Sequence, residues 1–219
     1  IHLTEHNRGA WLTRLLGARY GVAEKLRGKG RFWRDSFSHF YRRVASGNTR
    51  HTVESHLDAL RRIGIQPEPH ERRLALVAGA DADAYVEREL ARHGLHGQPF
   101  IHLHPTSRWL FKCWPEKNMS ALIAALQAAG HRVVLSAAPD THEMAMLQRI
   151  VAPLAAPVVD LSGKLTLKQL AALSAKAALF IGVDSAPMHI AAAMQTPVVA
   201  LFGPSGDKEW GPWMTPQRI

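Results

Sequence analysis

The chain has 219 residues, of which 47% are apolar and 21% charged, so it is long enough for one large or two small globular domains. Its single cysteine excludes a disulfide scaffold, and no run of about 18 apolar residues predicts a membrane-spanning helix. The net charge of +9 is concentrated in residues 1–73, which hold 15 Lys and Arg against 7 Asp and Glu. This asymmetry favours an anionic partner (nucleic acid, a phosphorylated substrate or a bilayer surface) over a merely solvated basic face.

The first residues predict short α/β elements. Residues 1–3 have the pattern of a strand end, residues 7–17 that of an amphipathic helix ended by a glycine, and residues 20–22 that of a short strand. The stretch KLRGKGRFWRDSFSHFYRR, residues 25–43, interleaves basic and aromatic side chains and has the pattern of a loop.

A helix is predicted over residues 52–64, TVESHLDALRRIG. Thr52 is a candidate N-cap, and Gly64 ends the pattern. The apolar face of this helix recurs at helical spacing through Val53, Leu57, Leu60 and Ile63.

After a proline-containing connector at residues 65–73, helical patterns and short apolar strands alternate. Strands are predicted within residues 99–105, 131–139, 157–163, 178–183 and 197–204, and helices within residues 81–95, 116–130, 140–154, 166–177 and 185–195. The strands are continuous apolar runs, which is typical of a parallel sheet covered on both faces. We therefore predict an α/β protein with a domain boundary near residues 76–80. A basic, incomplete α/β piece (residues 1–78) precedes that boundary, and a nearly complete Rossmann-like domain (residues 79–219) follows it.

Ligands of open parallel sheets bind at the carboxyl ends of the strands, so the residues that follow each strand are candidate site residues. In HPTSRWLFKCWP, the side chains of Thr106, Ser107, Arg108 and Lys112 suit phosphate oxygens. The alternative is a capped turn with solvated cations. Cys113 has no motif around it and is predicted to be a packed small residue.

Two further strand ends carry weaker signals. In SAAPDTHEM, either Asp140 or Glu143 suits a ribose, although an acid at this point also caps a helix. In DLSGKLTLKQL, a tight turn precedes a helix capped by Thr166. Leu165 in that turn suits a flat base, or is a core residue.

The stretch GVDSAPMHIAAAM predicts a strand end followed by a helix N-terminus. Unpaired N–H groups and a partial positive charge make such a terminus an anion site, with a diphosphate as the natural ligand. Pro187 suits the first turn, and His189 lies four residues after Ser185 on the same helical face. Asp184 is unexpected beside a phosphate unless it faces N–H groups or sugar hydroxyls. The alternative is a capping Asp and a core histidine.

Other chemistries have weak sequence support. The 13 histidines are scattered, and HLH at residues 102–104 lacks a third ligand nearby, so no metal site is expected. The chain has no GxGxxG after a strand and no Walker A pattern, which argues against ordinary dinucleotide or ATP chemistry.

Two of these segments carry a family resemblance. GVDSAPMHIAAAMQTPVVALFGPS and HPTSRWLFKCWP resemble motifs of the ADP-heptose:lipopolysaccharide heptosyltransferases, which are inverting, metal-independent glycosyltransferases of the GT-B fold. The resemblance implies two Rossmann-like domains, of which the first is incomplete in this chain. Together with RHTVESHLDALRRIGI, the second motif is most similar to the heptosyltransferase III branch. The resemblance covers about residues 50–210, and residues 1–49 match more loosely.

The resemblance implies a diphosphate site. Thr106, Ser107 and Lys112 would hold the donor diphosphate, and Lys112 would offset charge on the departing ADP. Ser185 and Ala186 would present backbone N–H groups to it. Ala186 replaces a common glycine, which tolerates the same backbone only if its φ is negative, and the loop around Lys112 is one residue longer than in type I enzymes.

The resemblance also implies how the rest of the donor is held. Asp184 and His189 would orient the phosphate and the heptose, Leu165 falls where the family contacts adenine, and Asp140 or Glu143 falls where it binds ribose. No cofactor and no metal are implied.

The catalytic base is not identified in these residues. The family uses an Asp early in the first domain, and inverting transfer needs a carboxylate that takes the acceptor's proton. That Asp is expected outside this chain, whose first residue is Ile1, and the first domain is therefore expected to be incomplete.

The basic first third is explained by the implied acceptor, a phosphorylated lipopolysaccharide core. The resemblance places the protein in the cytoplasm, in peripheral contact with the anionic inner membrane of a Gram-negative bacterium, with no nucleic-acid partner. Trp11, Phe32, Trp33 and Phe37 either seat the acceptor or pack in the core. A GT-B sugar-nucleotide epimerase and a basic nucleic-acid-binding α/β protein are the alternatives, and the acceptor heptose and oligomeric state stay open.

Overall fold

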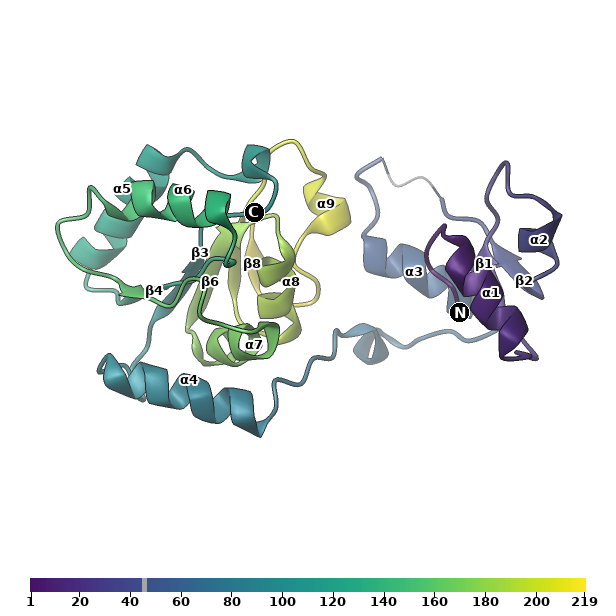
Figure 1. Ribbon diagram of the computed structural model, residues 1–219, viewed down its shortest axis with the longest axis horizontal. Helices are drawn as coiled ribbons and strands as arrows, with labels where there is room; N and C mark the ends of the chain where they lie inside the picture. The colour runs from purple at the N-terminus through teal and green to yellow at the C-terminus, as the bar shows by residue number, and fades with distance from the viewer. Residues whose placement is uncertain (45–46) are drawn as a thin grey trace. The chain divides into compact units, whose positions relative to one another are not determined.

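The computed structural model describes residues 1–44 and 47–219, in two compact units, Ile1–Arg72 and Arg73–Ile219 (Figure 1). Each unit has its own parallel strands. Among the described residues, no helix is both long enough and apolar enough to cross a bilayer. The functional assignment of the two predicted domains stays a prediction.

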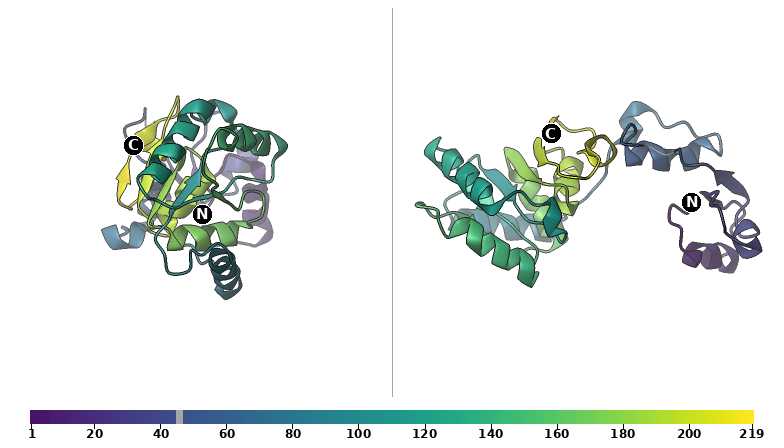
Figure 2. Two further views of the ribbon diagram at one scale, coloured as in Figure 1. Left: turned by 90° about the vertical axis from the view of Figure 1, so that its left-hand side faces the viewer. Right: turned by 90° about the horizontal axis from the view of Figure 1, so that it is seen from above.

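The second unit is built on one parallel sheet of six strands. Its order is β5-β4-β3-β6-β7-β8, with all neighbours parallel (Figures 1 and 2). The strands are β3 (Ile101–His104), β4 (Val133–Leu135), β5 (Val159–Asp160), β6 (Leu179–Val183), β7 (Val198–Leu201) and β8 (Gln217–Arg218). The chain runs outward from β3 to β5 and then returns to β6 on the other side of β3. The predicted α/β class is confirmed, and the switch point lies between β3 and β6.

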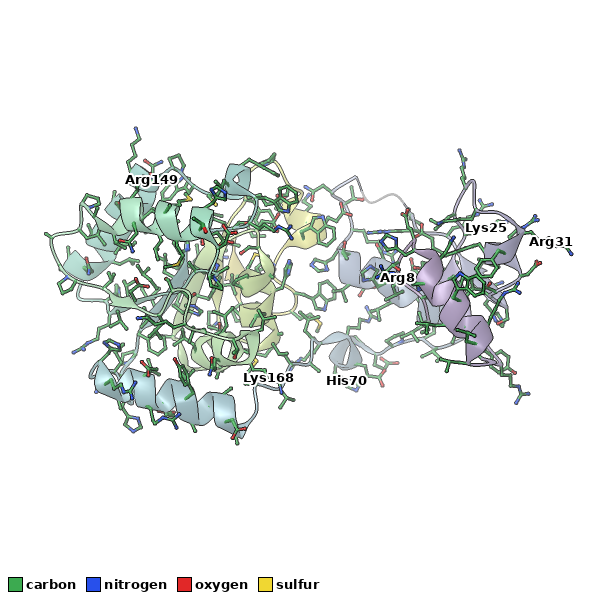
Figure 3. All side chains as sticks on the ribbon, viewed as in Figure 1. Arg8, Lys25, Arg31, His70, Arg149 and Lys168 are labelled. Carbon is green, nitrogen blue, oxygen red and sulfur yellow. The ribbon has the colours of Figure 1, made fainter. Side chains whose placement is uncertain are left out.

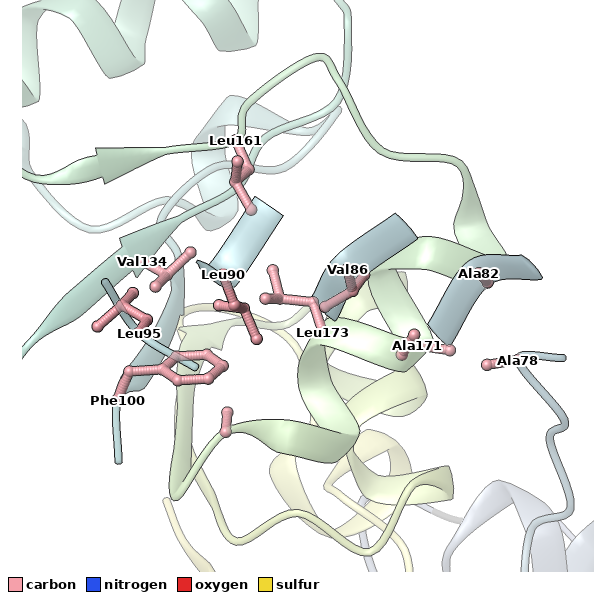
Figure 4. Close-up of a cluster of buried hydrophobic side chains, with 12 residues drawn as sticks. Ala78, Ala82, Val86, Leu90, Leu95, Phe100, Val134, Leu161, Ala171 and Leu173 are labelled. Carbon is pink, nitrogen blue, oxygen red and sulfur yellow. The ribbon is translucent and has the colours of Figure 1, made fainter. Parts of the chain in front are cut away.

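Helices cover both faces of this sheet. They are α4 (Ala80–Arg92), α5 (Glu116–Ala128), α6 (Thr141–Val151), α7 (Leu167–Lys176), α8 (Ala186–Ala193) and the short α9 (Asp207–Trp210). Helices α5 and α6 pack with the apolar side chains of β3 and β4 in one buried cluster. Helices α4 and α7 belong to a second cluster, which includes Leu90, Leu173, Phe100 and Val134 (Figure 4).

Side-chain alternation in β3 divides its residues between these two faces. Ile101 and Leu103 belong to the cluster with α5 and α6. His102 contacts Ser174 of α7, so the histidines of β3 lie on the opposite face. All four residues of the strand are buried, so the histidines that alternate with Ile101 and Leu103 in the sequence are enclosed on the α7 face of the sheet and not exposed to solvent.

The helix ends of this unit follow the predicted chemistry closely. Thr166 caps α7 in a capping box, in which its hydroxyl accepts from the N–H of Gln169 and the Gln169 side chain accepts from the N–H of Thr166. Helix α9 and strand β8 were not predicted, because they span only four and two residues and lack a periodic pattern.

The first unit contains two parallel strands, and His2 forms an isolated parallel bridge to Ala23. Its elements are α1 (Asn7–Leu15), β1 (Val22–Glu24), α2 (Arg31–Arg34), β2 (His39–Tyr41), α3 (Thr52–Arg61) and the 3₁₀ turn η1 (Pro69–Arg72). The predicted strand at residues 20–22 lies two residues later. The loop prediction for residues 25–43 was wrong at α2 and β2, where buried Trp33 and Phe37 stabilise structure that the Gly- and Arg-rich local sequence does not indicate. The rest of this stretch is irregular, as predicted.

Helix α3 also differs from its prediction. The ring Nδ1 of His51 accepts the capping hydrogen bond from the N–H of Val53, so Thr52 is not the N-cap. The fully buried positions are the small residues Thr52, Ser55 and Ala59. Ile63, predicted on the apolar face, is exposed.

Candidate functional site

A cavity of about 660 Å³ opens at the carboxyl ends of β3, β4 and β6 in the second unit. Its volume falls in the range of roughly 300–1,000 Å³ that is usual for small-molecule sites. Its position at the β3–β6 switch point is where doubly wound sheets bind ligands. The sequence predictions named eleven residues for this region. Nine of them line the cavity: Ser107, Arg108, Lys112, Glu143, Leu165, Asp184, Ser185, Ala186 and His189.

The cavity's lysine is paired with a carboxylate of the chain itself. Nζ of Lys112 lies 2.6 Å from Oδ2 of Asp184, and both side chains are largely shielded from solvent. Lys112 lies in the loop after β3, in the 3₁₀ turn η2 (Leu110–Lys112), and Asp184 directly follows β6, on the other side of the switch point. Asp184, the acid that looked out of place at a helix N-terminus, therefore balances the Lys112 charge at this point.

A second polar pair involves the residues predicted to bind phosphate and ribose. Thr106 is fully buried, does not line the cavity, and donates from Oγ1 to Oε2 of Glu143 at 2.7 Å. Glu143 therefore borders the cavity, whereas the Thr106 hydroxyl contacts Glu143 from outside the cavity lining. Asp140 also lies outside the cavity lining, because its Oδ1 caps α6 by accepting from the N–H groups of His142 and Glu143. Of the two ribose candidates, Glu143 alone lines the cavity.

The N-terminus of α8 forms one wall of the cavity. Ser185 is the N-cap with an extended backbone, and its side chain makes no capping bond to the helix. Ala186 begins the helix, and its φ is not positive. An alanine can therefore take the place of the family's common glycine here without backbone strain. Pro187 occupies the first turn, and His189 lines the cavity from the same helix. The first N–H groups of α8 therefore border the cavity, as an anion site requires.

A comparison with known protein families shows which family the chain with this cavity belongs to. The family model for glycosyltransferase family 9 (heptosyltransferase) matches residues 1–219.

The chain belongs to glycosyltransferase family 9.

Named relatives agree with this assignment. The chain is 38% identical over 215 residues to lipopolysaccharide heptosyltransferase 3 of Escherichia coli, a match that covers 97% of this chain and 61% of the relative. This chain thus spans about three fifths of that relative's length.

Solved structures show the same fold. A family 9 glycosyltransferase from Veillonella parvula has a TM-score of 0.88 at 22% identity, covering 100% of this chain and 61% of its own. The ADP-heptose heptosyltransferase II of E. coli has a TM-score of 0.76 at 21% identity, covering 99% and 66%. The expected GT-B type of fold and the family resemblance are confirmed.

In this family 9 chain, sequence reasoning missed three polar residues that line the cavity, His104, Ser136 and Ser205. Nδ1 of His104 lies 2.8 Å from Oγ of Ser136. His104 ends β3 and was considered only as a metal ligand, whereas Ser136 directly follows β4. The strand-end rule alone pointed to both. Burial lowers the pKa of His104 to about 4 and that of His102 to about 3, so both rings are neutral at pH 7.

The cavity rim is aromatic. Trp109 and Trp210 line the cavity and keep 59% and 40% of their surface exposed, so their rings are available to a flat ligand. Cys113 packs beside the α5–α6 cluster, as predicted, and burial raises the pKa of its thiol. Within the described part of the chain, no group of three His, Cys, Asp or Glu side chains is placed to hold a metal ion.

The first unit of the family 9 chain has a basic cavity of its own. Its volume is about 420 Å³, and it lies at the carboxyl ends of the parallel strands β1 and β2. Its charged lining consists of Lys25, Arg27, Arg42 and Arg43 with a single acid, Glu24. Lys25, labelled in Figure 3, shows where the chain leaves β1.

Proposed function

We propose that the protein is an inverting, metal-independent heptosyltransferase that transfers heptose from ADP-heptose to the lipopolysaccharide inner core. The observation that carries this proposal is the cavity at the β3–β6 switch point. It combines Lys112, the N-terminus of α8 and a row of hydrogen-bonding side chains beside an apolar wall. This is the combination that a nucleotide-diphosphate sugar needs.

In the proposed complex, the diphosphate lies between Lys112 and the first N–H groups of α8. An ammonium group has three N–H donors, so Lys112 can keep its bond to Asp184 and still donate to phosphate oxygens. Charge on the departing ADP is then offset without a metal ion. Ser107 and His189 supply further donors, and Leu165 supplies apolar surface for the adenine.

The proposed ribose contact is Glu143. Its Oε2 accepts from Thr106, which fixes the carboxylate and leaves the other oxygen for a sugar hydroxyl. Asp140 is less suitable, because its carboxylate is already engaged at the N-terminus of α6.

The catalytic base is proposed to be an aspartate outside these 219 residues. An acceptor hydroxyl must lose its proton to a carboxylate as the nucleotide leaves from the opposite face. We call the cavity at the β3–β6 switch point the donor cavity. Its two carboxylates have other partners, because Asp184 pairs with Lys112 and Glu143 accepts from Thr106. Neither is therefore assigned as the base.

The proposed acceptor site includes the basic cavity of the first unit. Lysine and arginine side chains at two strand ends suit the phosphates of a lipopolysaccharide core. Residues 1–78 are accordingly proposed to bind the acceptor, and residues 79–219 the donor. An anionic acceptor in a membrane would bring the protein to the cytoplasmic face of the inner membrane of a Gram-negative bacterium as a peripheral protein.

Calorimetry of the protein with ADP, UDP and a short RNA tests the proposal. ADP is expected to bind, with UDP weaker and RNA without a stoichiometric site. Tight UDP binding without ADP binding would contradict a heptosyltransferase. An epimerase, the alternative, would alter its sugar nucleotide without any acceptor. Acceptor-dependent release of ADP from ADP-heptose therefore separates the two enzymes.

A further inference from the structure

Four buried polar side chains form a continuous row that ends at the donor cavity. Ser174 Oγ lies 3.1 Å from Nδ1 of His102, and Nε2 of His102 lies 2.7 Å from Oγ of Ser136. Ser136 Oγ lies 2.8 Å from Nδ1 of His104, which lines the cavity. The row connects α7, β3 and the end of β4, and none of its members is more than 4% exposed.

Counting protons fixes the direction of these hydrogen bonds. Over residues 1–44 and 47–219, the only hydrogen-bond partner of the Ser174 hydroxyl is Nδ1 of His102. A fully buried O–H must donate to some acceptor, so Ser174 donates to His102. By contrast, the hydroxyl of the buried Ser120 on α5 has only backbone carbonyls as partners, those of Glu116 and Ile150, and donates its proton there.

The rest of the row follows from that first bond. Because Nδ1 of His102 accepts, the proton of this neutral ring is on Nε2, which donates to Ser136. A serine hydroxyl has one proton, so Ser136 must use it toward Nδ1 of His104. His104 then carries its own proton on Nε2. All bonds in the row point the same way, which strengthens each of them.

The Nε2 atom of His104 is the end of the row. It makes no hydrogen bond to any residue in the described ranges. Among the described residues, the side-chain atoms that are both enclosed and without a hydrogen-bond partner are the hydroxyls of Thr52, Ser162 and Ser205. Nε2 of His104 is not one of them, so this unpaired atom is not enclosed. A neutral N–H donor is therefore open to the cavity, in which Glu143 and Asp184 supply only acceptors.

We propose that His104 is a further ligand-binding residue of the donor cavity, whose Nε2–H donates to a phosphate oxygen of the bound nucleotide. His102, Ser136 and Ser174 are positioning residues that hold the His104 proton on Nε2. Phosphate oxygens only accept hydrogen bonds, so the opposite proton order would turn a lone pair toward them. This inference rests on the proposed function, because it takes the cavity's ligand to be a nucleotide diphosphate.

Histidine ¹⁵N spectra of the full chain test the proton order directly. With ¹⁵N-labelled histidine, couplings to the ring protons identify the protonated nitrogen, and spectra of His102→Gln and His104→Gln variants assign the two signals. Both rings are expected as Nε2–H tautomers at pH 7. Addition of ADP is expected to shift the Nε2 signal of His104 more than that of His102. An Nδ1–H tautomer at His104, or an Nε2 signal unmoved at saturating ADP, would overturn the proposal.

Affinity measurements give a second test. Ser136→Ala removes the hydroxyl that sets the tautomer and is expected to weaken ADP binding about tenfold, the loss of one hydrogen bond to a charged group. His104→Gln retains an N–H donor and is expected to bind ADP better than His104→Phe. Equal ADP affinities for the Gln and Phe variants would overturn the proposal.

Ser120→Ala is the matched control, because it removes a buried serine hydroxyl away from the cavity. It is expected to lower stability while the Kd for ADP stays unchanged. If the wild-type protein does not bind ADP at all, the proposed function fails, whereas the tautomer in the free protein still tests the proton order.

Discussion

Nζ of Lys112 lies 2.6 Å from Oδ2 of Asp184, although 72 positions of sequence separate the two residues. The pair joins the loop after β3 to the loop after β6 across the switch point of the sheet. It keeps the lysine ammonium at the cavity wall with its charge balanced before any ligand arrives. A diphosphate bound as proposed would therefore meet an oriented cation whose side-chain freedom is already reduced.

Lys112→Ala is expected to weaken ADP binding about 10- to 100-fold, because it removes a charge-assisted bond to the diphosphate. It also leaves Asp184 buried without its cation, so the protein should unfold at lower denaturant concentration at pH 7. Calorimetry with ADP and urea unfolding measure the two effects.

Lys168→Ala serves as the matched control, since Lys168 is exposed and does not line the donor cavity. It should change neither the Kd for ADP nor the unfolding midpoint. An ADP affinity of Lys112→Ala equal to that of the wild type would remove Lys112 from the site.

Thr106→Val distinguishes two roles for the buried hydroxyl. Thr106 Oγ1 donates to Glu143 Oε2, so its loss should loosen the carboxylate proposed to bind ribose. ADP affinity is then expected to fall about five- to tenfold, the worth of one hydrogen bond. The affinity for pyrophosphate, which has no ribose, should not change.

The two ligands are compared on the same Thr106→Val protein by calorimetry. A parallel loss of pyrophosphate affinity would restore Thr106 to the phosphate site that the family resemblance implies. Asp140→Ala is the control for the α6 N-terminus, because its carboxylate caps that helix outside the cavity. It should lower stability by about 1 kcal/mol and leave ADP binding intact.

The donor cavity was predictable where the signal is local in sequence. Strand ends carry their own polar residues, so Ser107, Asp184 and Ser185 were found by position alone. The capping box of Thr166 is local in the same way. His104 also ends a strand, but its hydrogen bond to Ser136 was not predictable, because 32 positions separate the two residues and no local pattern indicates the bond.

The first unit was less predictable for a related reason. Helix α2 and strand β2 have no more than four residues each and hold their shape through buried aromatic contacts, among them the ring pair Trp33–Phe37. Short elements have little periodicity to detect, and tertiary packing decides their conformation. The same limit applies to α9 and β8 in the second unit.

Charge reversal in the basic cavity of the first unit tests the acceptor site. Arg42→Glu should raise the KM for a phosphorylated core acceptor about tenfold or more, because it replaces a cation at the strand end by an anion. The Kd for ADP should not change. Initial rates against acceptor concentration and calorimetry with ADP give the two constants.

Arg31→Glu is the matched control, since Arg31 is exposed on α2 and lies outside that cavity. An equal rise in KM for both variants would point to a diffuse charge effect and against a discrete acceptor site. That outcome is distinguished further by salt, because diffuse surface attraction is screened at high ionic strength.

The buried histidines predict how stability depends on pH. Burial lowers the pKa of His102 to about 3 and that of His104 to about 4, below their ordinary value of 6.5. Between pH 4 and 6.5 the unfolded chain therefore binds protons that the folded chain does not, and acidification favours unfolding. The stability present above pH 6.5 should fall by roughly 1.4 kcal/mol per pH unit for each histidine within that window.

Urea unfolding at pH 7 and pH 5 measures this loss, with His104→Gln as the comparison. Burial also lowers the pKa of His56 in the first unit, so His56 adds to the loss of stability at acidic pH. Because His56 is present in both proteins, its contribution cancels when the wild type and the variant are compared. A hydrogen bond from Arg50 lowers the pKa of Asp58 below its ordinary value of 3.8. Asp58 therefore affects stability mainly below about pH 4, outside the range of the histidines. The variant should therefore lose less stability between pH 7 and pH 5 than the wild type, by the share of one histidine. The same loss in both proteins would mean that His104 is charged in the folded state.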